Sequence, residues 1–134
     1  MKENQPFDLR ARARSFVYAF AGWRYVIRHE HNVRIHLFML AVMVGLGVWL
    51  EIGRIEWAIL LLTFTGVLSG EMFNSAIEAV VDMTSPDPHP LAKAAKDVAA
   101  GAVLFAACTA VLIGLLILGP PLWQKMSFLF ASYQ

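Results

Sequence analysis

The sequence predicts an all-α integral membrane protein, with an N-terminal amphipathic helix at the membrane interface and three transmembrane helices. Apolar residues make up 58% of the 134 residues, against about 45–50% in an ordinary soluble domain. The mean hydropathy is +0.58. The apolar residues gather in three long runs, so we expect a single membrane domain, 1–134, that spans the bilayer at 33–50, 55–81 and 98–118.

The first element, residues 7–28, has the pattern of a basic amphipathic helix. One side of its helical wheel is apolar and aromatic, and the other side is basic with two tyrosines. The apolar side carries Leu9, Ala13, Phe16, Phe20, Trp23 and Ile27, and the polar side carries Arg10, Arg14, Tyr18, Tyr25 and Arg28. Because a membrane span follows directly, we expect this helix to lie in the membrane interface. The alternative is a helix packed on a partner.

The three apolar runs differ in length. The first, 33–50, is the shortest and carries Arg34 and His36 near its start. It spans the bilayer if these two side chains extend toward the interface, and we interpret His36 as a residue of the helix start and not as a ligand. The second run, 55–81, and the third, 98–118, easily reach the roughly 20 residues that a spanning helix needs.

The connections between the runs are of two kinds. The first is short and contains Gly53. The second, 83–96, holds three prolines, and we expect a loop there because a proline disfavours helix in the residue before it. The Gly-Pro-Pro sequence at 119–121 predicts the end of the third span.

Basic residues are unevenly distributed along the chain. Six arginines lie in its first quarter, namely Arg10, Arg12, Arg14, Arg24, Arg28 and Arg34. The connection 83–96 adds Lys93 and Lys96, whereas the first connection offers only Arg54 beside two glutamates. Since lysine and arginine favour the cytoplasmic side of a membrane, we expect a cytoplasmic N-terminus and a C-terminus outside.

A polar stripe interrupts the second run. Glu71, Asn74, Glu78 and Asp82 are spaced by three, four and four residues, so they share one helix face. Counted from Ile55 at about 1.5 Å per residue, Glu71 lies roughly 24 Å into a hydrocarbon core about 30 Å thick. The stripe therefore opens toward the cytoplasm and does not cross the membrane.

Ionisable residues of the other spans fall at the same level. Lys96 and Asp97 precede the third run, and Glu30 precedes the first. Carboxylates at this depth need a partner or a metal ion. One interpretation is structural, with the carboxylates paired to Lys96 and arginines. The other is a Mg²⁺ site built from carboxylates and substrate phosphates, in which a spare carboxylate acts as general base. The residues alone do not name a reaction.

Several motifs are absent from the sequence. It contains no Walker A sequence, no protein-kinase glycine-rich loop and no H-E-x-x-H zinc motif. Cys108 is the single cysteine, which excludes an intrachain disulfide and a thiolate zinc cluster. We expect no nucleic-acid partner.

Two stretches carry a family resemblance. "EMFNSAIEAVVD" (71–82) and "HPLAKAAKDVAAGAVL" (89–104) resemble the signature of the prokaryotic diacylglycerol kinases, which are small three-span membrane kinases without a Walker A motif. The resemblance extends to the amphipathic helix and to the order of the spans. The second stretch is more like the Gram-positive branch, whose members resemble undecaprenol kinases.

The resemblance implies a homotrimer in the bacterial inner membrane, with sites shared between neighbouring protomers and facing the cytoplasm. It implies transfer of the ATP γ-phosphate, with Mg²⁺, to a lipid hydroxyl, most directly that of undecaprenol and alternatively that of diacylglycerol. It assigns Glu71 as the general base, and Glu30 and Glu78 as the metal carboxylates. The implied nucleotide contacts are Tyr18, Glu30, Asn74, Glu78, Asp82, His89, Lys96 and Asp97.

A function of another class is a small non-enzymatic pathway for protons or cations along the acidic stripe. A pathway needs polar groups at all depths, and the stripe occupies one side of the membrane only. This position argues against a pathway.

Overall fold

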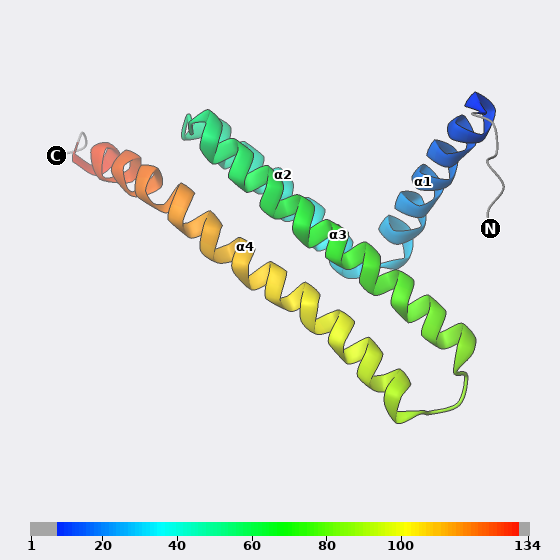
Figure 1. Cartoon of the computed structure of the whole chain (residues 1–134). Coiled ribbons are helices and arrows are strands. Elements are labelled where there is room, and N and C mark those ends of the chain that lie inside the picture. Colours follow the sequence, from blue (N-terminus) through cyan, green and yellow to red (C-terminus); the bar gives the residue numbers. More distant parts are fainter. Residues whose placement is uncertain (1–7, 132–134) are drawn as a thin grey trace.

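The computed structural model describes residues 8–131, and every structural statement below refers to them. They form four helices, α1 (Leu9–His29), α2 (His31–Trp49), α3 (Arg54–Thr84) and α4 (Pro90–Ala131), and no strand. Within this part of the chain α2, α3 and α4 are long and apolar enough to cross a membrane. These three helices pack alongside one another, whereas α1 leaves them at an angle (Figure 1). The predicted all-α membrane class is confirmed.

α1 begins at an N-cap and ends at a sharp change of direction. The Asp8 carboxylate accepts a hydrogen bond of 2.8 Å from the Arg10 backbone N–H, which satisfies one of the free donors at the helix start. Glu30, between α1 and α2, has extended backbone angles. On α1 the Phe16 and Phe20 side chains are largely exposed, as expected for a helix whose apolar face meets lipid. Phe7, the first residue of the predicted helix, lies outside the described residues.

The helices differ in length, and this difference positions the site. At about 1.5 Å per residue, the 19 residues of α2 extend about 28 Å, the 31 of α3 about 46 Å and the 42 of α4 about 63 Å. α2 therefore matches a hydrocarbon core of about 30 Å, whereas α3 and α4 are long enough to project beyond it. The buried apolar side chains lie along the lines where these helices meet, and include Val33, Met43, Leu60, Val67, Ala99 and Val103.

The turn between α2 and α3 has a defined geometry. The Ile52 N–H bonds to the Gly47 carbonyl and the Glu51 N–H to the Val48 carbonyl, both at 3.2 Å. This is the pattern of a Schellman motif, and Glu51 occupies its left-handed position with φ of 56°. The Glu56 carboxylate then caps the start of α3 by accepting from the Gly53 N–H.

Gly47 also sets how closely α2 approaches α3. It is buried, and a Cβ placed there would lie 2.8 and 2.9 Å from two ring carbons of Trp57. A Cβ on Gly45, two residues earlier in the same helix, would meet nothing within 4 Å. The indole ring of Trp57 therefore occupies space that exists only because residue 47 is glycine.

The structure corrects the extent of the predicted loop, and it shows that the helix does not stop at the Gly-Pro-Pro sequence. The expected loop at 83–96 is helical at both ends, and only residues 85–89 separate α3 from α4. Pro90 is the first residue of α4, a position where the missing N–H costs nothing. The helix also continues through Pro120 and Pro121 to Ala131. In an apolar environment a helix end would leave more backbone groups unpaired than two prolines do, which favours continuation.

We expect Gly47→Ala to destabilise the protein by about 1–3 kcal/mol, because the new methyl group overpacks the contact with Trp57. Thermal unfolding in detergent, followed by circular dichroism, measures this as a lowered midpoint. Gly45→Ala is the matched control and should leave the midpoint unchanged or slightly raised. Equal midpoints for the two variants would contradict this, since they would show that the α2–α3 contact accommodates the methyl group with no loss of stability.

Candidate active site

Five of the residues predicted for the site lie where α3 and α4 extend past α2, namely Glu78, Asp82, His89, Lys96 and Asp97. Since α2 begins five residues before His36, and His36 contacts Glu71, α3 passes the start of α2 near residue 76. It then continues to Thr84, roughly 12 Å farther. We call residues 77–97, comprising this extension, the loop and the first turns of α4, the hairpin end. It is the lower right part of Figure 1.

Glu71 is the innermost member of the polar stripe and is almost completely buried, with 2% of its surface exposed. Its Oε1 lies 3.1 Å from Nε2 of His36 on α2. Because an ionised carboxylate can only accept a hydrogen bond, Nε2 of His36 is then the donor. The Ser75 hydroxyl donates to the Glu71 backbone carbonyl at 3.0 Å and leaves the carboxylate untouched.

Asn74 and Glu78 form a second unit, one turn farther along α3. The Asn74 amide N–H donates to Oε1 of Glu78 at 3.1 Å. The amide oxygen of Asn74 is buried and has no hydrogen-bond partner among the described residues. A buried acceptor without a donor is costly, so this oxygen is suited to a bound cation or to a ligand group that donates.

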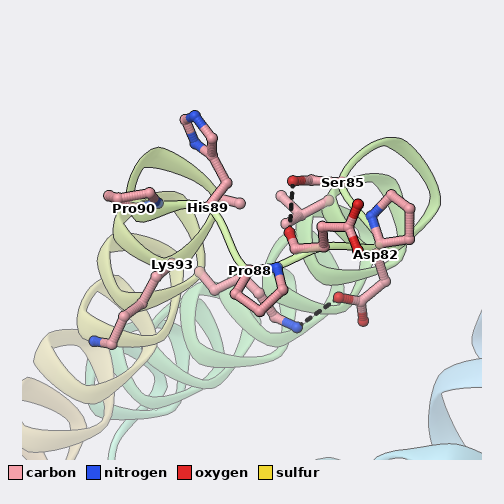
Figure 2. Close-up of a pocket in the computed structure, with 11 residues that line it drawn as sticks. Asp82, Ser85, Pro88, His89, Pro90 and Lys93 are labelled. Carbon is pink, nitrogen blue, oxygen red and sulfur yellow. Dashed lines mark hydrogen bonds and ion pairs between the residues drawn. The ribbon is translucent and has the colours of Figure 1, made fainter.

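Asp82 joins α3 to α4 through Lys96. The Lys96 ammonium donates to Oδ1 of Asp82 at 2.8 Å, as the dashed line in Figure 2 shows. This hydrogen bond, with the negative charges of Asp82 and Glu78, raises the pKa of Lys96 above its ordinary value, although partial desolvation opposes the shift. Lys96 precedes the apolar run of α4 and therefore carries a positive charge at the water-facing end of the helices.

An open pocket of about 530 Å³ surrounds this pair. Its walls are the end of α3, the proline-rich loop and the start of α4, and they include Asp82, Ser85, His89, Lys93 and Lys96. In Figure 2 the His89 ring and the Lys93 side chain point away from Asp82. The His89 ring instead accepts a hydrogen bond of 3.2 Å from the Leu91 N–H and so caps α4.

The remaining predicted residues lie apart from these units. Asp97 is paired with Lys93, four residues away on the same helix face. Tyr18 is 71% exposed on α1. Glu30, between α1 and α2, makes no capping hydrogen bond with its side chain. It precedes His36 by six residues, which places it at about the level of residue 77 on α3.

The oxygen atoms near Glu78 fit a hard cation. Glu78 and the unpartnered oxygen of Asn74 offer the carboxylate and amide ligands that Mg²⁺ accepts, and Mg²⁺ usually needs only one or two protein carboxylates beside phosphates. Across residues 8–131, no group of three or more His, Cys, Asp or Glu side chains is arranged to hold a metal ion.

An apolar groove of about 540 Å³ runs between α2, α3 and α4. Its walls include Met39, Val42, Leu60, Phe64, Val111 and Leu115. His36 and Val67 are the wall residues nearest to Glu71. His36 contacts Glu71, and Val67 lies one helical turn before it, but Glu71 is not part of the wall. The groove thus has apolar walls along most of its length and passes close to the buried carboxylate through His36.

Comparison with known proteins identifies the family of this chain. The sequence profile of the prokaryotic diacylglycerol kinase family matches residues 17–118. The chain belongs to this family. It is 43% identical to an undecaprenol kinase of Bacillus subtilis, over 81% of this chain and 89% of the relative. It is 44% identical to a diacylglycerol kinase of Synechocystis sp., over 84% of this chain and 65% of the relative.

A third relative, a diacylglycerol kinase of Escherichia coli, is 33% identical over 75% of this chain and 83% of its own length. The protein is therefore a membrane lipid kinase, and its family uses ATP as the phosphate donor. The non-enzymatic pathway is excluded as its function.

His36 is the residue that sequence reasoning missed. The sequence predicts only a residue of the helix start, whereas the structure places the His36 ring against Glu71. The alternative pairing of the carboxylates with lysine and arginine applies to Asp82, which bonds Lys96, and not to Glu71. An imidazole inside an apolar run needs a polar partner. The presence of His36 in such a run is therefore the sequence signal that could have predicted a contact with a polar residue of another helix.

Proposed function

We propose that this lipid kinase transfers the ATP γ-phosphate to the hydroxyl of undecaprenol. The observation that carries the proposal is the burial of Glu71 against His36, a residue that lines the apolar groove. A polyprenyl chain lying in the groove would bring its terminal hydroxyl near this carboxylate, which could accept the proton of the hydroxyl. The similarity to an undecaprenol kinase over most of both chains supports this acceptor.

In this proposal Glu71 is the general base. It accepts the proton of the lipid hydroxyl while the lipid oxygen bonds to the γ-phosphorus, and the bond from that phosphorus to ADP breaks. Phosphoryl transfer depends mainly on positioning and on electrostatic stabilisation. The contact with His36 supports positioning, because α2 and α3 together hold the Glu71 carboxylate in one place.

The nucleotide is proposed to bind at the hairpin end. Glu78 and Asn74 are the candidate holders of Mg²⁺, and Glu30 is the candidate second carboxylate because it lies at about the same level. When bound, Mg²⁺ would neutralise phosphate charge. Lys96 supplies a further positive charge, held in place by Asp82. Tyr18, His89 and Asp97 are proposed to contact the nucleotide at the periphery.

Diacylglycerol is the second candidate acceptor. Two relatives named diacylglycerol kinases are 44% and 33% identical to this chain. An acyl chain would fit the apolar walls of the groove as well as a polyprenyl chain does. The two lipids must therefore be separated by experiment.

We further propose that the hairpin end faces the cytoplasm of the bacterial inner membrane. The arginine-rich N-terminal region and the lysines of the hairpin end support this orientation. To test this orientation, a cysteine is introduced at position 54 or at position 85, and intact cells are treated with a membrane-impermeant thiol reagent. The cysteine at position 54 is expected to be labelled, and the cysteine at position 85 is expected to be protected.

The deciding assay offers undecaprenol and diacylglycerol separately to the purified protein in mixed micelles with labelled ATP and Mg²⁺. We expect label in undecaprenyl phosphate at several times the rate seen for diacylglycerol, since the groove continues for many residues along α4. Faster labelling of diacylglycerol would show that diacylglycerol, and not undecaprenol, is the preferred acceptor. No label in either lipid would contradict the proposed function.

Substitution of two carboxylates should separate chemistry from nucleotide binding. Glu71→Gln removes the base and should lower kcat by about 10²–10⁴-fold, with little change in the affinity for Mg·ATP. Glu78→Gln should weaken Mg·ATP binding by about 10–100-fold. Steady-state kinetics and equilibrium binding of a fluorescent ATP analogue measure both effects. Loss of nucleotide binding in Glu71→Gln would move that residue to the metal site.

The resemblance to the prokaryotic diacylglycerol kinase family supports a homotrimer with shared sites. Light scattering corrected for bound detergent should give the mass of three chains of 14.9 kDa. A fully active monomer would contradict the shared sites.

A further inference from the structure

The hydrogen bond between His36 and Glu71 joins two helices that are far apart in sequence. His36 is on the second turn of α2, and Glu71 is in the middle of α3. The Nε2–Oε1 distance of 3.1 Å makes it a direct contact. The His36 side chain is 20% exposed and that of Glu71 only 3% exposed. Each side chain lacks any other ionic partner among the described residues.

This contact has a specific consequence for the position of Glu71. The carboxylate is 2% exposed, and its ion pair in the described part of the chain is with His36. The imidazole on α2 is therefore the group that holds this carboxylate in one orientation across the contact between the two helices.

The contact also determines which carboxylate oxygen is available. His36 engages Oε1. Among the described residues no hydrogen bond to Oε2 is present, so this oxygen keeps its capacity to accept a proton. His36 itself lines the apolar groove, so the contact with Oε1 lies beside the wall of the groove.

We propose that His36 is a positioning residue for lipid phosphorylation, holding the Glu71 carboxylate through Oε1 so that Oε2 accepts the proton of the acceptor hydroxyl. This inference rests on the proposed role of Glu71 as general base. The proton moves from the lipid hydroxyl to Oε2, the lipid oxygen bonds to the γ-phosphorus of ATP, and ADP leaves with the electrons of the broken bond. His36 does not take part in these bond changes and keeps its own proton on Nε2.

Three variants of the full-length protein test the proposal. In His36→Gln the terminal amide N–H can take the place of Nε2–H. In His36→Asn the shorter side chain does not reach that position, although it is equally polar. In His36→Leu the donor is absent. Each is assayed in micelles with undecaprenol, diacylglycerol and Mg·ATP, beside the wild type and Glu71→Gln, and thermal midpoints are recorded.

We expect His36→Leu and His36→Asn to lose about 10- to 100-fold in kcat, the loss of a hydrogen bond to a charged group. The KM for Mg·ATP should stay within about twofold, because the nucleotide lies elsewhere. His36→Gln should recover most of kcat. This recovery separates hydrogen bonding from packing, since a purely structural role of the ring would be lost equally in Gln and Asn.

Two results would overturn the proposal: wild-type kcat in His36→Leu, or equal losses in His36→Gln and His36→Asn. Failure of the proposed function would look different. If the wild-type protein labels neither lipid, the proposed lipid acceptors are wrong. If Glu71→Gln has wild-type activity, Glu71 is not the general base. If the wild type is active, Glu71→Gln is inactive and the His36 variants are unaffected, only the positioning role fails.

Discussion

The hydrocarbon interior of a membrane offers the backbone no hydrogen-bond partner, and the architecture of this protein depends on that constraint. Every spanning segment must satisfy its N–H and C=O groups internally, so each becomes a helix. A helix advances by about 1.5 Å per residue, which converts position in the sequence into depth. The depth of Glu71, the level of Glu30 and the projection of the hairpin end all follow from this conversion. The site is thus defined first by depth and only then by contacts.

Depth also explains why the polar side chains use different partners. Glu71, the innermost, is buried and forms a hydrogen bond with the imidazole of His36 on a neighbouring helix. Asp82, the outermost, is exposed and faces a lysine. Exposed ion pairs of this kind contribute little to stability, about 0–1 kcal/mol. The Asp82–Lys96 pair therefore serves mainly to place a positive charge at the hairpin end, whereas the His36–Glu71 pair joins a buried carboxylate on α3 to α2.

Apolar packing shapes the remainder of the fold in a way that leaves room for a lipid. Gly47 allows α2 to meet Trp57 closely at the end far from the site. The same three helices leave the apolar groove between them, lined on α2 by residues as near to Gly47 as Leu46 and on α4 as far as Leu122. The bundle thus combines one close contact at Gly47 with an open apolar groove along its length.

The sequence by itself determined the fold class, the family and the face on which Glu71, Asn74, Glu78 and Asp82 lie, because hydrophobic length and helical periodicity are local properties. It was wrong about the extent of the loop and about Pro120 and Pro121, since a helix boundary depends on what surrounds the backbone and not only on proline content. Only the tertiary structure decided the partners. Asp97 pairs with Lys93 on its own helix, and Lys96 pairs with Asp82 on α3. His36 forms a hydrogen bond with Glu71, which lies 35 residues later in the sequence. These pairings depend on how the helices are rotated and aligned against one another, which is settled by the packing of side chains such as Val33, Leu60 and Val67.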